Sequence, residues 1–332
     1  MIAIFGAGAI GCWVGGRLAA GGAAVTLIGR ARVVDEVGGG LRVTQLDGPE
    51  AAVTVAATTE AAAAAAAELV IVTVKSAQTA QAGAELARVL PPGTTVVSLQ
   101  NGVRNADVLR RALPAQRVLA AMVPFNVVRR APGAYHRASQ GTLMIDDDPA
   151  GLAMRRACEA ARLPIEPRRD MPAVHWGKLV MNLNNAINAL SGQPLAAELS
   201  QRAFRRCLAA AQREALGALA AARIPIARLT AIPPRLMPSL LTLPDAIFAR
   251  LARRVVAIDL HARSSMWDDL EANRPTEIDY LQGEIVALAD RVAQGAPVNR
   301  TLVALVRAAE AGGKRDYTGG ELGAALGIPA AT

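Results

Sequence analysis

The chain of 332 residues is longer than a single hydrophobic core usually supports, which predicts two domains. Hydrophobic residues make up 52% of it and charged residues 19%, a balance that argues against intrinsic disorder. The formal charge of +8 does not indicate a nucleic-acid partner, because the arginines are spread along the chain with few aromatic residues among them; it suits anionic cofactors and acidic substrates.

The cysteines and the N-terminal segment bear on the cellular compartment. Cys12, Cys158 and Cys207 are odd in number and widely spaced, and they form no C-x-x-C pair, which favours a reducing, cytoplasmic compartment. The first 29 residues carry a single charge, Arg17, but they hold eight glycines and lack a basic start. We therefore expect no signal peptide, no membrane span and no membrane partner.

The first 167 residues alternate short β-rich apolar runs with alanine-rich helical stretches, the pattern of βαβ units. The predicted strands are residues 2–5, 25–28, 69–74, 95–99, 118–123 and 143–145, and the predicted helices are residues 10–20, 78–90 and 106–112. This pattern predicts an α/β Rossmann domain with a mostly parallel sheet over residues 1–167.

Beyond Met171 the strand-like runs stop and long helical patterns follow. The predicted helices are residues 174–190, 195–222, 246–260, 264–273, 277–294 and 299–311. We therefore predict an all-helical C-terminal domain over residues 171–332, which carries substrate binding and catalysis. The proline-bearing stretch 163–172 is interpreted as the joint between the domains.

The segment Gly6-Ala7-Gly8-Ala9-Ile10-Gly11 follows the first predicted strand and opens the first predicted helix. The first glycine permits a tight turn, the second lets the backbone approach a pyrophosphate, and the third permits close packing of the helix, whose N-terminal N–H groups face the anion. A G-x-G-x-x-G motif alone is weak evidence. Between a strand and a helix, these six residues predict a dinucleotide cofactor.

The end of the second predicted strand indicates which dinucleotide is bound. NAD-preferring units carry a carboxylate about 20 residues beyond the glycines, which accepts from the ribose 2′-hydroxyl. Here the strand ends in Gly29-Arg30-Ala31-Arg32, where Arg30, with or without Arg32, can bind a 2′-phosphate. The alternative is that both arginines are solvated loop charges. The pattern favours NADPH/NADP+ as the cofactor.

Two loops follow strands at the edge of the sheet where ligands bind in α/β folds, Val74-Lys75-Ser76 and Leu99-Gln100-Asn101-Gly102-Val103. Asn101 could face both the nicotinamide and the substrate from this edge. Its alternative role is that of a turn-forming residue before Gly102, with hydrogen bonds to the local backbone only.

A lysine and a run of asparagines lie on the first helix of the second domain. On a regular helix Asn182 and Asn185 lie about 40° and −20° from Lys178, on one face, and Asn188 lies about 80° away, at its edge. Such a lysine can donate a proton to a carbonyl oxygen while the amides orient the substrate. The alternative is that Lys178 reaches to solvent and that the asparagines cap or bridge helices.

Two further polar segments lie downstream, Ser264-Ser265-Met266 and Thr276-Glu277-Ile278-Asp279-Tyr280. Thr276 is predicted to cap a helix, with Asp279 as the acid of a capping box, so Glu277 could be an ordinary acid of the first turn. No metal site is predicted, because the histidines show no ligand spacing such as H-x-x-x-H. They are His136, His175 and His261.

Taken together and in this order, the motifs resemble the ketopantoate reductase (2-dehydropantoate 2-reductase) family over nearly the whole chain. The resemblance implies NADPH-dependent reduction of 2-dehydropantoate to pantoate, as in pantothenate and coenzyme A biosynthesis. The segments that carry it are Gly6-x-Gly8-x-x-Gly11, Val74-Lys75, Leu99-Gln100-Asn101-Gly102-Val103, Gly177-Lys178-x-x-x-Asn182, Ser264-Ser265-Met266 and Arg274-Pro275-Thr276-Glu277-Ile278-Asp279-Tyr280.

The resemblance also implies roles for single residues. Lys178 matches the general acid at the ketone oxygen, and Glu277 matches the residue that holds the substrate hydroxyl. Ser265 and Asn182 match substrate contacts. The residues expected at the cofactor, besides the glycine motif, are Arg30 at the 2′-phosphate, Lys75, Asn101 and Glu277.

Two features depart from the family pattern. The family's second helix asparagine would be residue 186, which here is Ala186, with Asn185 and Asn188 nearby as substrate-binding candidates. Segment 122–128 also differs from the small residues expected beside the nicotinamide. A reductase of another small keto acid therefore stays open, as does a non-catalytic NADPH-binding sensor, for which Lys178 would have no use. Both a monomer and a homodimer are open.

Overall fold

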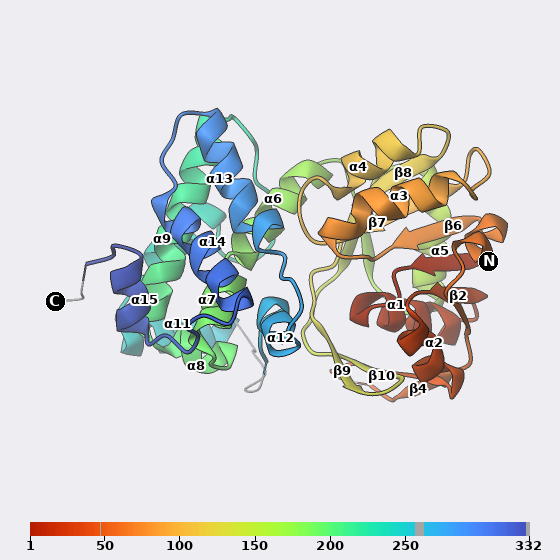
Figure 1. Cartoon of the computed structure of the whole chain (residues 1–332), viewed down its shortest axis with the longest axis horizontal. Coiled ribbons are helices and arrows are strands. Elements are labelled where there is room, and N and C mark those ends of the chain that lie inside the picture. The colour runs from red at the N-terminus through yellow and green to blue at the C-terminus, as the bar shows by residue number, and fades with distance from the viewer. Residues whose placement is uncertain (47, 256–261, 330–332) are drawn as a thin grey trace. The chain divides into compact units, whose positions relative to one another are not determined.

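The structure is a computed structural model that describes residues 1–46, 48–255 and 262–329. The chain divides into two compact units, Met1–Met171 and Pro172–Thr332, each with its own core. Figure 1 shows that strands are confined to the first unit, whereas helices build the described part of the second. The predicted fold class, a Rossmann unit followed by a helical unit, is confirmed.

An eight-stranded sheet forms the middle of the N-terminal unit, in the order β12-β11-β8-β7-β6-β1-β2-β5. Its neighbouring strands are parallel except for β8 and β11, which pair antiparallel. All six strands predicted from the sequence are present. The strands are β1 (Ile2–Phe5), β2 (Val25–Ile28), β5 (Ala56–Thr58), β6 (Leu69–Val72), β7 (Thr95–Leu99), β8 (Arg117–Met122), β11 (Leu143–Asp146) and β12 (Ile165–Arg168).

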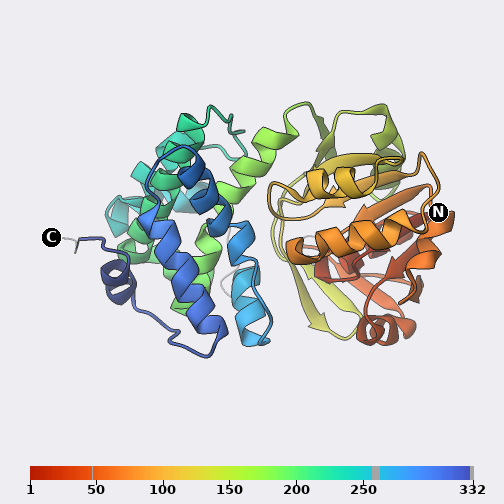
Figure 2. The same ribbon diagram turned by 45° about the horizontal axis from the view of Figure 1, so that its top comes forward.

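Both faces of this sheet are buried, because successive side chains of a strand point to opposite faces. Ile4 packs in one hydrophobic cluster with α1 and α5, and Phe5 packs in another with α3 and α4. Figure 2 shows α3 and α4 side by side across the second face. The helices of this unit are α1 (Ala9–Ala20), α2 (Ala31–Gly38), α3 (Thr79–Ala87), α4 (Asn105–Ala112) and α5 (Leu152–Ala160).

A second, four-stranded sheet covers the outer side of α1 and was not predicted. Its order is β4-β3-β10-β9, and its strands are β3 (Leu41–Thr44), β4 (Ala51–Val53), β9 (Val127–Ala131) and β10 (Ala134–Arg137). Trp13 of α1 is fully buried beneath it, donates from Nε1 to the Thr44 carbonyl at 2.8 Å and packs edge-on against Phe125. Segment 122–128 therefore contributes Phe125 to the core as well as the start of β9.

The stretch interpreted as the joint was partly wrong. Residues 165–168 form β12, which pairs in parallel with β11 at the edge of the large sheet. Pro167 is tolerated there because an edge strand needs hydrogen bonds on one side only.

The C-terminal unit is arranged around α9, which contacts α7, α8, α10, α13, α14 and α15. The helices that the structure describes are α6 (Met171–Asn182), α7 (Asn184–Ser191), α8 (Leu195–Ser200), α9 (Arg202–Ala221), α10 (Met237–Leu241), α11 (Asp245–Val255), α12 (Ser265–Glu271), α13 (Gln282–Arg291), α14 (Pro297–Glu310) and α15 (Gly319–Ala325). The end of the predicted helix 246–260 and His261 lie outside the described residues.

The predicted helix 174–190 is broken at Leu183, between α6 and α7. Side-chain amides satisfy carbonyl groups at the break: Gln282 Nε2 donates to the Leu183 carbonyl at 2.8 Å, and Gln212 Nε2 donates to the Val180 carbonyl at 3.3 Å. The interruption is local, because Leu183 keeps helical dihedral angles and its N–H donates to the Leu179 carbonyl at 3.1 Å. The predicted helix 195–222 is broken more sharply, at Gln201, whose backbone is extended.

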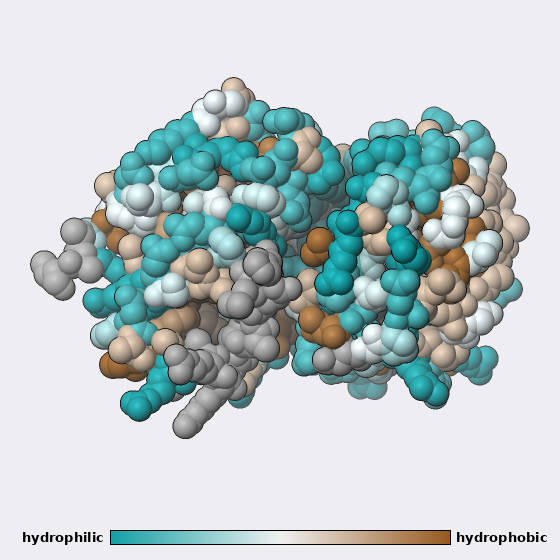
Figure 3. All heavy atoms as spheres, turned by 90° about the horizontal axis from the view of Figure 1, so that it is seen from below, coloured by the Kyte–Doolittle hydropathy of each residue, from teal (hydrophilic) through white to brown (hydrophobic). Residues whose placement is uncertain are grey.

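On the face drawn in Figure 3, hydrophilic and hydrophobic residues are both exposed on each unit. Within the described ranges, no helix combines the length and the apolar character needed to cross a lipid bilayer.

Arg205 of α9 is fully buried and ties three segments of the helical unit together. Its guanidinium donates to the Leu241 carbonyl at 3.0 Å, to the Leu243 carbonyl at 2.6 Å and to Asp245 Oδ1 at 2.8 Å. It also donates to the carbonyls of Leu199 and Ser200 at the end of α8. The planar five-donor fork of arginine fits this set of acceptors, which an ammonium could not match.

We predict that Arg205→Leu destabilises the protein by about 3–5 kcal/mol, because several buried acceptors lose their donor at once. The half-exposed neighbour Arg206 serves as the control, and Arg206→Leu should change stability by less than about 0.5 kcal/mol. Urea unfolding followed by tryptophan fluorescence measures both. Equal stability of the two variants would contradict this role of Arg205.

Candidate active site

The glycine motif forms a tight turn between β1 and α1. Gly6 has φ of +110°, and a Cβ there would lie 2.6 Å from the Val74 nitrogen. A Cβ on Gly11 would lie 2.5 Å from the Gly6 carbonyl oxygen and from Thr73 Oγ1. Both positions therefore require glycine, one for its backbone conformation and both for space.

The turn leaves room and hydrogen-bond donors for an anion. A Cβ on Gly8 would meet only the Gly6 carbonyl oxygen, at 4.0 Å, so the space above this residue is open. Helix α1 begins at Ala9 without a side-chain cap, so the N–H groups of its first turn have no acceptor within the helix. Such a helix start suits the pyrophosphate of a dinucleotide.

Arg30 lies where the sequence analysis placed the 2′-phosphate reader, two residues beyond the end of β2. It is exposed, and its backbone caps α2. No ion pair of Arg30 occurs among the residues that the structure describes, whereas Arg32 pairs with Glu36 at 3.5 Å. Of the two arginines, Arg30 is thus the better placed to bind a phosphate.

The loop after β6 is held by Gln100, which the sequence analysis did not single out. Gln100 is buried, and its Nε2 donates to the Val74 carbonyl at 2.9 Å and to Thr79 Oγ1 at 2.8 Å. Its Oε1 accepts from Ser98 Oγ at 2.9 Å. One amide therefore links the ends of β6 and β7 to the start of α3.

Asn105, also buried and also missed, completes this network. Its Oδ1 accepts from Thr79 Oγ1 at 2.9 Å, and its Nδ2 donates to Ser76 Oγ at 3.1 Å and to the Asn101 carbonyl. The half-buried Lys75 and Asn101 are thereby held on adjacent loops at the carboxyl edge of the sheet. The signal in the sequence was the short spacing of polar residues in 98–105, but their pairing depends on the fold.

Lys178 lies on α6, one turn before the helix break. The residue keeps intermediate exposure, yet its ammonium is desolvated, and this burial lowers the pKa of Lys178 to about 8. Asn182 and Asn185 are also half-exposed, whereas Ala186, which directly follows Asn185, is fully buried. The expected face of Lys178, Asn182 and Asn185 is thus the more accessible one.

Asn188 does not have the expected role. It is fully buried, and its Nδ2 donates to the Gln193 carbonyl at 2.9 Å and to Glu198 Oε2 at 2.6 Å. Its Oδ1 accepts from the Ser264 backbone N–H at 2.8 Å. Because both amide protons are engaged inside the unit, the predicted substrate contact of Asn188 is wrong for this arrangement.

Ser265 is exposed as the first residue of α12, next to the buried cap Ser264. Ser264 Oγ accepts from the Trp267 N–H at 3.1 Å and donates to the Asn185 carbonyl at 3.2 Å. These bonds hold the start of α12 against α7. Ser265 and Asn185 are therefore on neighbouring segments of one unit.

Glu277 is half-exposed before a short 3₁₀ helix, Ile278–Tyr280, which precedes α13. The predicted continuous helix from residue 277 is thus wrong. The capping box is also wrong, because Asp279 pairs with Arg307 at 2.7 Å, while Thr276 Oγ1 accepts from the Ile278 N–H at 3.2 Å. Gln282, in the first turn of α13, donates to the Leu183 carbonyl. This bond links the region of Glu277 to the residue that follows Asn182.

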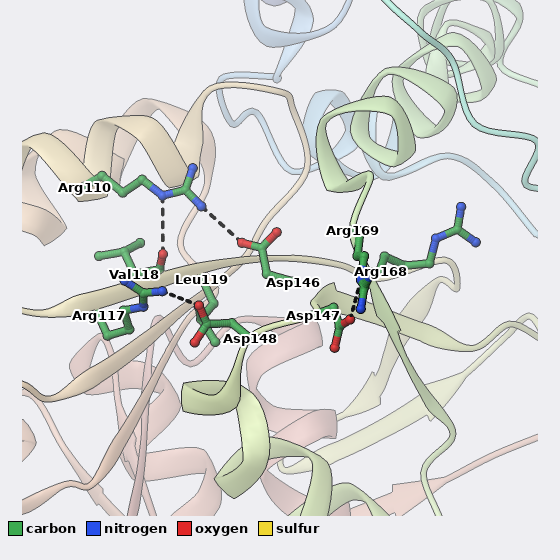
Figure 4. Close-up of a pocket in the computed structure, with 9 residues that line it drawn as sticks. All are labelled: Arg110, Arg117, Val118, Leu119, Asp146, Asp147, Asp148, Arg168 and Arg169. Carbon is green, nitrogen blue, oxygen red and sulfur yellow. Dashed lines mark hydrogen bonds and ion pairs between the residues drawn. The ribbon is translucent and has the colours of Figure 1, made fainter.

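A polar pocket of about 580 Å³ lies at the opposite edge of the sheet, where β8 begins and β11 and β12 end. Figure 4 shows arginine and aspartate side chains from these strand ends and from α4 around it. Its charges are paired within the protein, so it does not offer the free cations that a dinucleotide needs. The pairs are Arg110 with Asp146, Arg117 with Asp148 and Arg169 with Asp147.

Comparison with known proteins agrees with this division of the chain. Residues 2–149 match the family model of ketopantoate reductase PanE/ApbA, and residues 170–310 match the model of its C-terminal part. The chain belongs to the ketopantoate reductase family.

Individual relatives cover nearly the whole chain. The 2-dehydropantoate 2-reductase of Halobacterium salinarum is 31% identical over 94% of this chain and 99% of its own. The 2-dehydropantoate 2-reductase of Archaeoglobus fulgidus is 28% identical over 94% of this chain and 98% of its own. The solved structure of a PanE/ApbA family ketopantoate reductase from Ralstonia eutropha JMP134 has a TM-score of 0.80 and is 30% identical. The match covers 94% of this chain and 98% of that one.

The fold is shared more widely. A D-mandelate dehydrogenase solved with NADH and anilino(oxo)acetate has a TM-score of 0.77 at 20% identity, over 94% of this chain and 98% of that one. Ketopantoate reductase family members are oxidoreductases that act on small keto acids. The fold alone therefore does not select the keto acid.

We predict that Asn105→Leu weakens nicotinamide-cofactor binding by about tenfold, because the loops that carry Lys75 and Asn101 lose their common tie. Gln81→Ala, on the exposed side of α3, is the matched control and should leave the affinity unchanged. Titration of cofactor fluorescence measures both dissociation constants. An Asn105→Leu protein that folds and binds as tightly as the control would show that the network does not shape the site.

Proposed function

We propose that the chain catalyses the NADPH-dependent reduction of 2-dehydropantoate (ketopantoate) to pantoate, as in pantothenate and coenzyme A biosynthesis. The observation that carries the proposed reaction is the desolvated ammonium of Lys178, whose pKa of about 8 suits proton transfer near neutral pH. The full-length relatives named 2-dehydropantoate 2-reductase support this choice of substrate. We further propose that the protein is cytoplasmic and that it is either a monomer or a homodimer.

The residues of the N-terminal unit fit the cofactor. The backbone of the glycine turn and the start of α1 would hold the pyrophosphate, and Arg30 would hold the 2′-phosphate by charge-assisted hydrogen bonds. Lys75 and Asn101 are assigned to the nicotinamide end. When bound, NADPH supplies the hydride for the keto carbon.

Lys178 acts as the general acid. Negative charge develops on the ketone oxygen during reduction, and the ammonium donates its proton to that oxygen. Ser265 and Asn182 bind substrate oxygens, and Glu277 accepts from the substrate hydroxyl.

Asn185 takes the place of the missing family asparagine in this proposal. Ala186 is buried in α7, and the amide protons of Asn188 are engaged, whereas Asn185 is half-exposed and its carbonyl accepts from the cap of α12. The shifted amide is also the observation that favours a different small keto acid as substrate. Assays of NADPH oxidation with ketopantoate and with a panel of other 2-keto and 3-keto acids show which of them is the substrate. Binding of NADPH without oxidation by any keto acid would favour a non-catalytic sensor.

We predict that Lys178→Ala lowers kcat by about 10²–10⁴-fold while NADPH binding is retained, because the variant loses only the proton donor. Lys314→Ala is the control, since Lys314 is half-exposed and pairs with Glu321 at 2.7 Å. The reduction rate of the unmodified protein should be level below about pH 7, fall to half of that level near pH 8 and decrease further as the pH rises, because the protonated ammonium is the active form. A flat profile through pH 9 would remove Lys178 from this role.

We predict that Arg30→Ala raises the dissociation constant of NADPH about 10- to 100-fold, because one charge-assisted contact is lost. The dissociation constant of NADH should stay nearly unchanged. Arg32→Ala, in the first turn of α2, should change neither value by more than about twofold. Titrations of the parent and of both variants, each with NADPH and with NADH, test this. Equal losses for NADPH and NADH would rule out a 2′-phosphate contact.

A further inference from the structure

Asn188 connects three segments of the helical unit. It lies on α7, its Nδ2 reaches the Gln193 carbonyl and Glu198 Oε2 of α8, and its Oδ1 accepts from the Ser264 N–H just before α12. Figure 1 shows α12 beside α7, and the two helices are in contact. The side chain of Asn188 is fully buried, so these bonds are shielded from competing water.

The segment that leads into α12 is held by further bonds. The Leu195 N–H donates to the Ala262 carbonyl at 2.8 Å, and the Arg263 guanidinium donates to the Gly192 carbonyl. Arg263 also lies over the Trp267 ring, 4.1 Å from its centroid. The turn between α7 and α8 is thus a docking point for residues 262–264.

Glu198, the partner of Asn188, is a fully buried acid. Burial raises the pKa of Glu198 to about 8, although hydrogen bonds from Asn188 and Asn184 act in the opposite direction. The acid is therefore mainly neutral at pH 7, which avoids the cost of a buried charge and keeps Oε2 as the acceptor for Asn188. The facing titratable group is Cys207 of α9, whose pKa burial raises to about 12, so it is also neutral.

We propose that Asn188, oriented by Glu198, is a positioning residue that sets the Ser265 hydroxyl for the keto acid; this rests on the proposed function. Asn188 fixes the backbone of Ser264, the residue directly before Ser265, on the side of α7 that carries Asn185. Ser265 is exposed and free to contact substrate, while its position is determined from the buried side. A misplacement of about 1 Å at such a contact can cost about 100-fold in rate.

The test is a double-mutant cycle on keto-acid reduction. Asn188→Leu, which keeps the branching and the number of side-chain heavy atoms and removes the three bonds, should lower kcat/KM about 10- to 100-fold, chiefly through a higher KM for ketopantoate, with NADPH binding unchanged. Ser265→Ala should have a similar effect. In the Ser265→Ala background Asn188→Leu should add little, because the group that it positions is already absent.

Two comparisons separate positioning from a general loss of stability. Asn299→Leu removes another fully buried asparagine, which bonds the Ala211 carbonyl and Glu214, and should lower the melting temperature without raising the KM. Glu198→Gln mimics the neutral acid and should keep the KM, whereas Glu198→Leu should raise it. Hydrogen exchange of a peptide covering 262–270 should be faster in Asn188→Leu and Glu198→Leu than in the parent.

The outcomes are distinguishable. A parent protein that neither binds nor reduces any keto acid ends the proposed function, and the positioning role with it. An active parent in which the effects of Asn188→Leu and Ser265→Ala simply multiply, or in which exchange of residues 262–270 is unchanged, overturns the positioning role alone. If Asn188→Leu does not fold, the Glu198→Gln and Glu198→Leu pair decides the question by the same two measurements.

Discussion

The packing around Leu183, where α6 meets α7, is the constraint on which the candidate face of the helical unit depends. A regular helix would place Asn182, Asn185 and residue 188 in a fixed angular series from Lys178. Because Leu183 keeps helical dihedral angles, this series runs on through the interruption. Lys178, Asn182 and Asn185 keep partial exposure, while Asn188, at the edge of the face, is buried. Two glutamines from distant helices bond carbonyl groups at the break, and the unit's packing thereby controls which amides can meet a ligand.

The inner strands of the large sheet could be predicted because they are buried on both faces and read as continuous apolar runs, as in Leu69–Val72. The two edge strands, β5 and β12, were missed because they are only partly buried. The small sheet could not be predicted either. Strand β9 is an exposed edge with two arginines, and β4 spans only Ala51–Val53, so neither shows a clear hydrophobic alternation. These strands gain their stability from α1 beneath them, where Trp13 is fully buried, and that contact is not visible in local sequence.

The candidate site shows the same limit at the level of single residues. The glycine turn has a local signal, since its backbone conformation and close packing are required within a few residues. Asn185 and Asn188 are chemically identical and three residues apart, yet one is accessible and the other bonds Ser264, 76 residues away. Both lie on α7, beyond Leu183, and periodicity places Asn188 only at the edge of the face. Its burial follows from partners on α8 and just before α12, which local sequence does not show.

The choice of lysine at position 178 is itself informative. Only three of the 36 basic residues of the chain are lysines, at 75, 178 and 314, so arginine is the residue that this protein otherwise uses for positive charge. A guanidinium could supply charge and hydrogen bonds at position 178, but it cannot release a proton near neutral pH. Burial lowers the pKa of the Lys178 ammonium to about 8, which gives it a proton that it can both hold and transfer. Proton donation is therefore the property that distinguishes lysine from arginine at this position, and it is the property that reduction of a ketone needs.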